Sequence, residues 1–277
     1  MPQHGGPGRP EAEAKWVAVS GGPKGSVAVR ILRPKGAAGP LPAVVYVHGA
    51  DRVTGLAHDR LVRELAVGAH CAVLFPDYTP APAAGYGLAL EECYAVARWV
   101  DSHGAGYGMD RTRLAVAGDA VGGGIGVALA LLAKERGDFS FTQLLLLYPL
   151  PPEDRADPAS LSPRSGSTSF PHSPSPRAEG LPVHSGGVLR AAGQRPAGLP
   201  AATVVTAQAD APRDEGGAYA AALRAAGVAV TTVRCGSGSL DDLVRPGGSL
   251  PPGRAGEAAD VMARVVAALR CAFAAGR

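Results

Sequence analysis

The sequence predicts an α/β protein with a doubly wound, mostly parallel sheet, and three observations support this fold class. Six short apolar runs alternate with stretches that carry apolar residues at three- and four-residue spacing, which is typical of buried parallel strands and their crossover helices. Two earlier segments alternate in polarity around a Gly-Gly-Pro turn at residues 21–23, which predicts an antiparallel hairpin. The 277 residues, 46% of them hydrophobic, suffice for one large core.

The elements expected from these patterns follow one another along the whole chain. The hairpin strands should span residues 15–20 and 26–33. The parallel strands are expected at 43–47, 71–75, 114–118, 143–148, 202–207 and 228–234. The helices are expected at 58–67, 88–102, 121–136, 215–225 and 257–274.

Two regions lack this alternation of apolar runs and helical patterns. Residues 1–14 are polar and rich in Gly and Pro, so we expect a disordered N-terminus ahead of a single domain over 15–277. Residues 151–200 are rich in Pro, Ser and Gly, which predicts an irregular cap insertion after a strand that borders the ligand crevice. The central part of the insertion, 160–177, fits a disordered surface excursion equally well.

Composition excludes several classes of function. The 27 basic and 24 acidic side chains are scattered along the chain, so neither a nucleic-acid partner nor an anionic membrane is expected. No apolar run approaches a membrane span and the first residues lack the core of a signal peptide, which predicts a cytoplasmic protein. The four cysteines are widely spaced, so no metal and no cofactor is expected. The glycines from 118 to 126 miss the spacing of a dinucleotide-binding loop.

Two motifs lie where buried strands end. Residues 118–122, Gly-Asp-Ala-Val-Gly, join a strand to a helix in the context of a G-x-S-x-G nucleophile elbow, with Ala120 in place of serine. Residues 48–51, His-Gly-Ala-Asp, follow an earlier strand at the place of an oxyanion loop. With the segments at 77–82, 89–99 and 204–216, these motifs resemble the hormone-sensitive-lipase-like family of α/β-hydrolases, from about residue 16 onward. The resemblance implies an α/β-hydrolase fold, here with a reduced, irregular cap.

The resemblance also implies roles for three positions of the catalytic triad. The nucleophilic serine falls on Ala120, the triad acid falls on Asp210, and the histidine falls on Asp241. A one-residue slip would place Leu240 at the histidine position instead. Because alanine offers no nucleophile and a carboxylate does not replace imidazole, we expect no ordinary ester hydrolysis.

The anion-binding part of such a site does not depend on the missing side chains. The backbone N–H groups of Val121 and of the Gly49–Ala50 turn should stabilise a developing negative charge, because one lies at a helix N-terminus. Asp119 and Ala120 are expected to line the same substrate-binding crevice.

Three side chains are candidate bases at this crevice: His48, Asp51 and Asp241. Asp51 also fits a solvated loop residue beside Arg52 or a contact for a cationic ligand, and the carboxylate of a substrate is a further alternative base. If Asp210 and Asp241 keep their triad geometry, their proximity raises the pKa of one of them.

These features favour non-hydrolytic catalysis in natural-product biosynthesis. The chain resembles the atypical α/β-hydrolase-fold epimerases of bottromycin biosynthesis, which implies inversion of an aspartate α-carbon beside a thiazoline in a modified ribosomal peptide. The alternative is a non-catalytic, ligand-binding pseudohydrolase that sequesters or delivers a pathway intermediate. The reduced cap predicts a modified peptide or another bulky small molecule as the ligand. The oligomeric state is left open.

Overall fold

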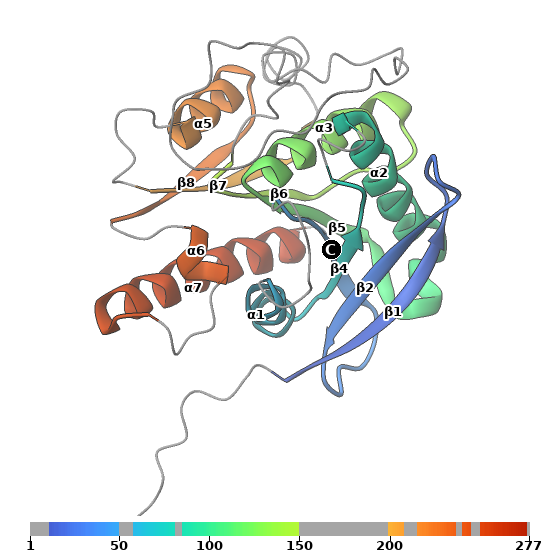
Figure 1. Ribbon diagram of the computed structural model, residues 1–277, viewed down its shortest axis with the longest axis horizontal. Helices are drawn as coiled ribbons and strands as arrows, with labels where there is room; N and C mark the ends of the chain where they lie inside the picture. The colour runs from blue at the N-terminus through green and yellow to red at the C-terminus, as the bar shows by residue number, and fades with distance from the viewer. Residues whose placement is uncertain are drawn as a thin grey trace, which may run out of the picture.

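A single mixed sheet organises the chain in the computed structural model, which describes residues 11–49, 58–80, 85–149, 199–207, 215–236, 240–244 and 250–275. Within that part of the chain the sheet has eight strands in the order β1-β2-β4-β3-β5-β6-β7-β8 (Figure 1). The strands are β1 (Ala12–Ser20), β2 (Ser26–Pro34), β3 (Leu41–Val47), β4 (Ala72–Asp77), β5 (Met109–Asp119), β6 (Gln143–Leu147), β7 (Ala201–Ala207) and β8 (Val230–Cys235).

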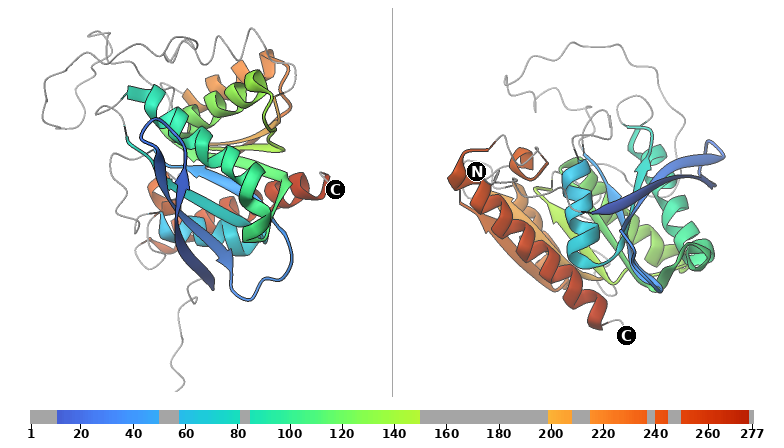
Figure 2. Two further views of the ribbon diagram at one scale, coloured as in Figure 1. Left: turned by 90° about the vertical axis from the view of Figure 1, so that its right-hand side faces the viewer. Right: turned by 90° about the horizontal axis from the view of Figure 1, so that it is seen from below.

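The strand directions confirm the predicted α/β class. β1 pairs antiparallel with β2, and β2 pairs antiparallel with β4. The strands β4, β3, β5, β6, β7 and β8 run parallel to one another. Figure 2 shows the β1–β2 ribbon at the edge of the molecule away from the C-terminal helix. Residues 12–14 were expected to be disordered, but in the structure they belong to β1. Its pairing with β2 extends to the pair Ala12↔Pro34.

Helices cover both faces of the sheet (Figure 1). The apolar cluster of one face includes side chains from α2, α3 and α5, and the cluster of the other face includes side chains from α1, α6 and α7. The helices are α1 (Asp59–Ala69), α2 (Gly85–His103), the 3-10 helix η1 (Gly104–Tyr107), α3 (Val121–Arg136), α5 (Glu215–Ala225), α6 (Leu240–Val244) and α7 (Pro252–Ala275). No helix among these described residues is both long and apolar enough to cross a membrane.

Parallel strands place the two motifs side by side. β3 is buried along its whole length and pairs with β5 up to Val47↔Gly118, so the residues after both strands meet at the same edge of the sheet. The cap predicted at 151–200 lies outside the described residues except for its last two positions.

Candidate active site

The elbow, residues 118–122, is a one-residue turn between a strand and a helix. β5 ends at Asp119 and α3 begins at Val121, so Ala120 alone reverses the chain. Its backbone has φ 46° and ψ −123°, a conformation of the first central residue of a type II′ turn that normally requires glycine. The Ala120 N–H donates to the carbonyl of Leu147 on the neighbouring strand at 3.0 Å.

Glycines make this turn sterically possible. A Cβ on Gly118 would collide with the carbonyl of Gly122, and a Cβ on Gly122 would lie 2.7 Å from the carbonyl oxygen of His48. The predicted strand–turn–helix geometry is therefore formed at Ala120, although its side chain is only a methyl group.

The loop after β3 lies directly against the elbow. A Cβ on Gly49 would lie 2.8 Å from the Cβ of Ala120, so backbone and methyl group are in close contact. The Gly49 N–H donates to Asp119 Oδ2 at 3.2 Å. The prediction that Gly49 offers its N–H to a substrate oxyanion therefore needs correction, because that N–H is used within the fold. Val121 remains at the start of α3, and Ala50 lies outside the described residues.

Asp119 was expected in the substrate crevice, but in the structure its carboxylate lies in the protein interior. The residue is 2% exposed. Besides the bond from Gly49, its Oδ1 accepts a hydrogen bond from the Tyr46 hydroxyl at 2.9 Å and lies 3.2 Å from His58 Nε2. Burial and then the charge of Asp119 raise the pKa of Tyr46 well above its usual value. A carboxylate with these partners organises protein groups and does not contact substrate.

His48 lies in a cluster of aromatic rings at the end of β3. Its side chain is buried, and its ring stacks on the rings of Tyr78 and Phe75 at centroid distances of 4.4 and 5.2 Å. The Tyr78 hydroxyl donates to the His48 carbonyl. A ring held in this packing does not face a substrate, so the structure argues against the prediction of His48 as a base.

Asp241 is exposed in the first turn of α6, which follows β8 after a short connection. The neighbouring Asp242 is buried instead and pairs with Arg254 at 2.5 Å. Asp51 and Asp210 lie outside the described residues, so their roles and the predicted coupling of Asp210 with Asp241 stay predictions.

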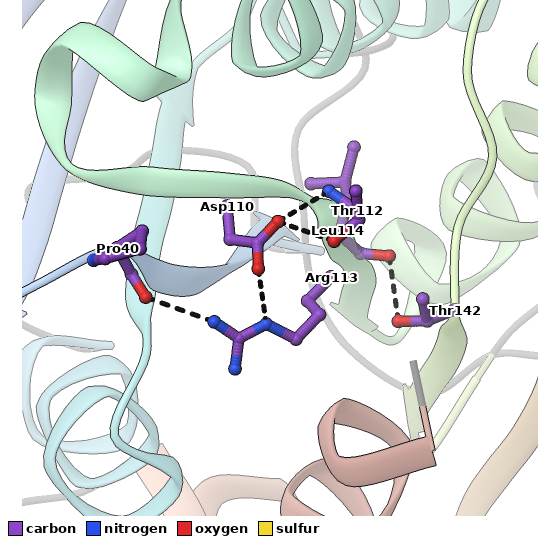
Figure 3. Close-up of polar contacts among 6 residues, drawn as sticks. All are labelled: Pro40, Asp110, Thr112, Arg113, Leu114 and Thr142. Atoms are coloured by element: carbon purple, nitrogen blue, oxygen red, sulfur yellow. Dashed lines mark hydrogen bonds and ion pairs between the residues drawn. The ribbon is translucent and has the colours of Figure 1, made fainter. Parts of the chain in front are cut away.

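A second polar cluster lies near the opposite end of β5 (Figure 3). Asp110 accepts hydrogen bonds from the Thr112 N–H and hydroxyl at 2.9 and 2.6 Å and from Arg113 Nε at 2.7 Å. Burial opposes ionisation of Asp110, but these hydrogen bonds outweigh it and lower its pKa. Arg113 Nη2 also donates to the Pro40 carbonyl at 3.1 Å. These contacts stabilise residues 110–113 of β5, at the end of the strand opposite to the elbow.

Comparisons with known proteins agree with this geometry. A family model described as alpha/beta hydrolase fold matches residues 44–238. Carboxylesterase NlhH of Mycobacterium tuberculosis is 36% identical over 74% of this chain and 67% of its own length. Esterase LipI of the same organism is 34% identical over 81% of this chain and 73% of its own length.

Similar solved structures are also named as esterases. A serine-to-alanine mutant of esterase rPPE, complexed with (S)-Ac-CPA, superposes with a TM-score of 0.77 at 32% identity, covering 98% of this chain and 86% of that one. A fungal esterase from Rhizomucor miehei has a TM-score of 0.74 at 26% identity, covering 98% and 87%.

These relatives overturn the predicted function. Proteins named esterase and carboxylesterase at 34–36% identity indicate ester hydrolysis. The predictions of a non-hydrolytic peptide epimerase and of a ligand-binding pseudohydrolase are therefore wrong, and the interpretation of the motif as a lost triad conflicts with the same relatives. The predicted α/β-hydrolase fold is confirmed. The chain belongs to the α/β hydrolase fold family, among relatives named as esterases.

Proposed function

We propose that this chain hydrolyses carboxylic esters at the elbow by direct attack of water, without an acyl-enzyme intermediate. The observation that carries the proposal is the strained backbone of Ala120, which joins β5 to α3 in the geometry of a nucleophile elbow. The esterase relatives support the reaction class. A serine-to-alanine mutant of the relative esterase rPPE forms a complex with (S)-Ac-CPA, which supports ligand binding in this fold without that serine hydroxyl.

The chemistry requires no side-chain nucleophile. The oxygen of a water forms a bond to the carbonyl carbon, and the π electrons move to the carbonyl oxygen. The N–H of Val121 at the positive end of α3 stabilises this oxyanion. Asp241, at the family's histidine position, is the candidate acceptor of the water proton. The oxyanion electrons then re-form the carbonyl as the ester C–O bond breaks. An alkoxide leaving group takes the proton held by Asp241, whereas a phenolate leaves unprotonated.

The absence of a nucleophile limits the expected rate. Serine proteases deprived of triad members retain about 10³–10⁴-fold acceleration from the oxyanion hole and substrate binding. We expect slow turnover of this order, with a strong preference for aryl esters, because phenolates leave without protonation.

The experiment measures hydrolysis of p-nitrophenyl acetate and butyrate. The wild type should show linear product release without an initial burst, and intact-protein mass spectrometry should show no added acyl group. Ala120→Leu should abolish the activity because it puts a bulky side chain at the elbow residue itself, next to the Val121 N–H. Ala130→Leu, a buried site further along the same helix, is the matched control for overpacking.

Two results would contradict the proposal. A burst with a covalent acyl adduct would show that a side chain attacks the ester. Equal rates for the wild type and Ala120→Leu would place the activity outside the elbow.

A further inference from the structure

We propose that a cavity at the amino ends of β3 and β5 binds a medium-chain carboxylate, with Arg113 and Arg270 contacting its charged group. The cavity has a volume of about 890 Å³, which is in the usual range of small-molecule sites. β3 begins at Leu41 and β5 begins at Met109, so the cavity lies at the edge of the sheet opposite to the elbow. The proposal therefore does not depend on the ester hydrolysis proposed at Ala120.

Arg113 is held in place by two of its three guanidinium nitrogens. Nε donates to Asp110 at 2.7 Å and Nη2 donates to the Pro40 carbonyl at 3.1 Å. The third nitrogen, Nη1, points away from both partners in Figure 3 and has no hydrogen bond within the part of the chain that the structure describes. Since the guanidinium is already fixed and its side chain is only 13% exposed, it loses little freedom when an anion binds.

The second cation of the cavity comes from α7. Arg270, Phe273 and Ala274 are three and four positions apart, so they share one face of the helix, and all three line the cavity. Arg270 is exposed and makes no ion pair with another described residue. Phe273 is buried and adds an apolar wall beside this charge.

The end of α1 forms another wall of the cavity. Ala69 and His70 line it, and the His70 N–H closes the helix by donating to the Val67 carbonyl. A Cβ on Gly68 would lie 2.7 Å from the Val266 side chain of α7, so glycine allows the two helices to pack closely. This packing holds the walls from α1 and α7 together beside the start of β3.

Charge and lining define the class of ligand. Two guanidinium groups and one carboxylate, Asp110, line the cavity, so its formal charge is +1 when His70 is neutral. A singly charged anion fits this balance, because the Asp110 carboxylate repels a multiply charged phosphate more strongly. Carboxylates also match the fork of guanidinium donors. Most of the other lining residues are apolar and suit an alkyl chain, among them Pro40, Leu41, Pro42, Ala69 and Phe273.

The binding experiment is a calorimetric titration of the protein with sodium octanoate. We expect saturable binding to one site, and affinity should rise by up to about 4-fold for each methylene from butyrate to octanoate. Octan-1-ol has the same chain without the charge, so it should bind at least about 10-fold more weakly. Inorganic phosphate supplies charge without a chain and should bind more weakly as well.

Two variants with matched controls locate the site. Arg270→Gln should weaken octanoate binding by about 10-fold or more, because a charge-assisted contact is lost. Arg111→Gln removes an equally exposed charge at the start of β5, outside the cavity lining, and should leave affinity unchanged. Ala274→Trp should obstruct the cavity without changing its charge, whereas Ala263→Trp adds the same side chain at an exposed position of α7 away from it.

Binding in Ala120→Leu separates this cavity from the elbow. Octanoate affinity should be unchanged in that variant, and it should persist even if the wild type hydrolyses no ester. Loss of octanoate binding in Ala120→Leu, with wild-type affinity in Arg270→Gln, would place the acid at the elbow and overturn the inference. The same conclusion follows if the wild type shows no saturable binding or if both Arg270→Gln and Ala274→Trp bind octanoate normally. Phosphate binding as tight as octanoate binding would refute the proposed class of ligand.

Discussion

Ala120→Gly should stabilise the protein, which is an unusual expectation for a glycine at the start of a helix. Ala120 has φ 46° and ψ −123°, a backbone region that costs a non-glycine residue about 1–3 kcal/mol. Glycine removes this strain. Against it stand about 0.5–1 kcal/mol for the greater freedom of glycine in the unfolded chain and a fraction of the roughly 0.8 kcal/mol of a buried methyl, since Ala120 is half-buried. The balance favours the variant by about 1 kcal/mol.

The assay is reversible urea unfolding, with Ala130→Gly as the matched control. Ala130 is buried in the interior of α3, where the same change costs about 1 kcal/mol of helix propensity and removes a packed methyl. The two variants should shift the unfolding midpoint in opposite directions. For a domain of this size the gain at Ala120 corresponds to about 2–4 °C in Tm. If both variants are destabilised by the same amount, the strain at Ala120 is absent and the elbow argument fails.

Three further predictions follow from described residues. Gly122→Ala should destabilise the protein by at least about 1–3 kcal/mol in urea unfolding, because its Cβ would meet the His48 carbonyl oxygen at 2.7 Å, whereas Gly253→Ala has open space and should be neutral or slightly stabilising. Cys271 is exposed and should react rapidly with a disulfide reagent near pH 8, whereas burial raises the pKa of Cys71 to about 12, so that thiol should react only after denaturation. Burial and then a hydrogen bond to a carboxylate raise the pKa of Tyr94 to about 12, above the value near 10 in an unfolded chain. The contribution of Tyr94 to the free energy of unfolding is therefore complete below pH 10 and is lost as the pH rises towards about 12. Tyr94→Phe should show a flatter pH dependence of stability in this range.

The sequence predicts those elements whose stability comes from burial. The expected bounds 121–136 and 215–225 agree with α3 and α5, because turn-favouring glycine, proline or aspartate residues flank both apolar patterns in the sequence. The start of β5 was missed, because residues 110–113 are polar and only the apolar run from Leu114 is visible as a pattern. That start is stabilised by the hydrogen bonds of Asp110, which apolar periodicity does not reveal. α6 has five residues and is too short to show a helical period.

The candidate site likewise has one part that the sequence predicts and one part that it does not. The turn at Ala120 follows from a local glycine spacing, so the motif alone predicts its geometry. The partners of Asp119 do not follow from any local pattern, since Tyr46 and Gly49 are 73 and 70 positions away in sequence. A buried tyrosine hydroxyl on β3 requires a partner, which is the one signal that points toward such a network. The contact between His58 and Asp119 was therefore not predicted from the sequence.

The shape of this elbow does not depend on the side chain of residue 120. Close backbone approaches at Gly118 and Gly122, the hydrogen bond from Ala120 N–H to Leu147, and the start of α3 all persist with a methyl group at the turn. A serine there would add a nucleophile without being needed for the fold. The stabilisation of a developing charge and the supply of a nucleophile are therefore separable properties of this site. In the proposed reaction the N–H of Val121 at the start of α3 supplies the first, and water with a proton acceptor supplies the second.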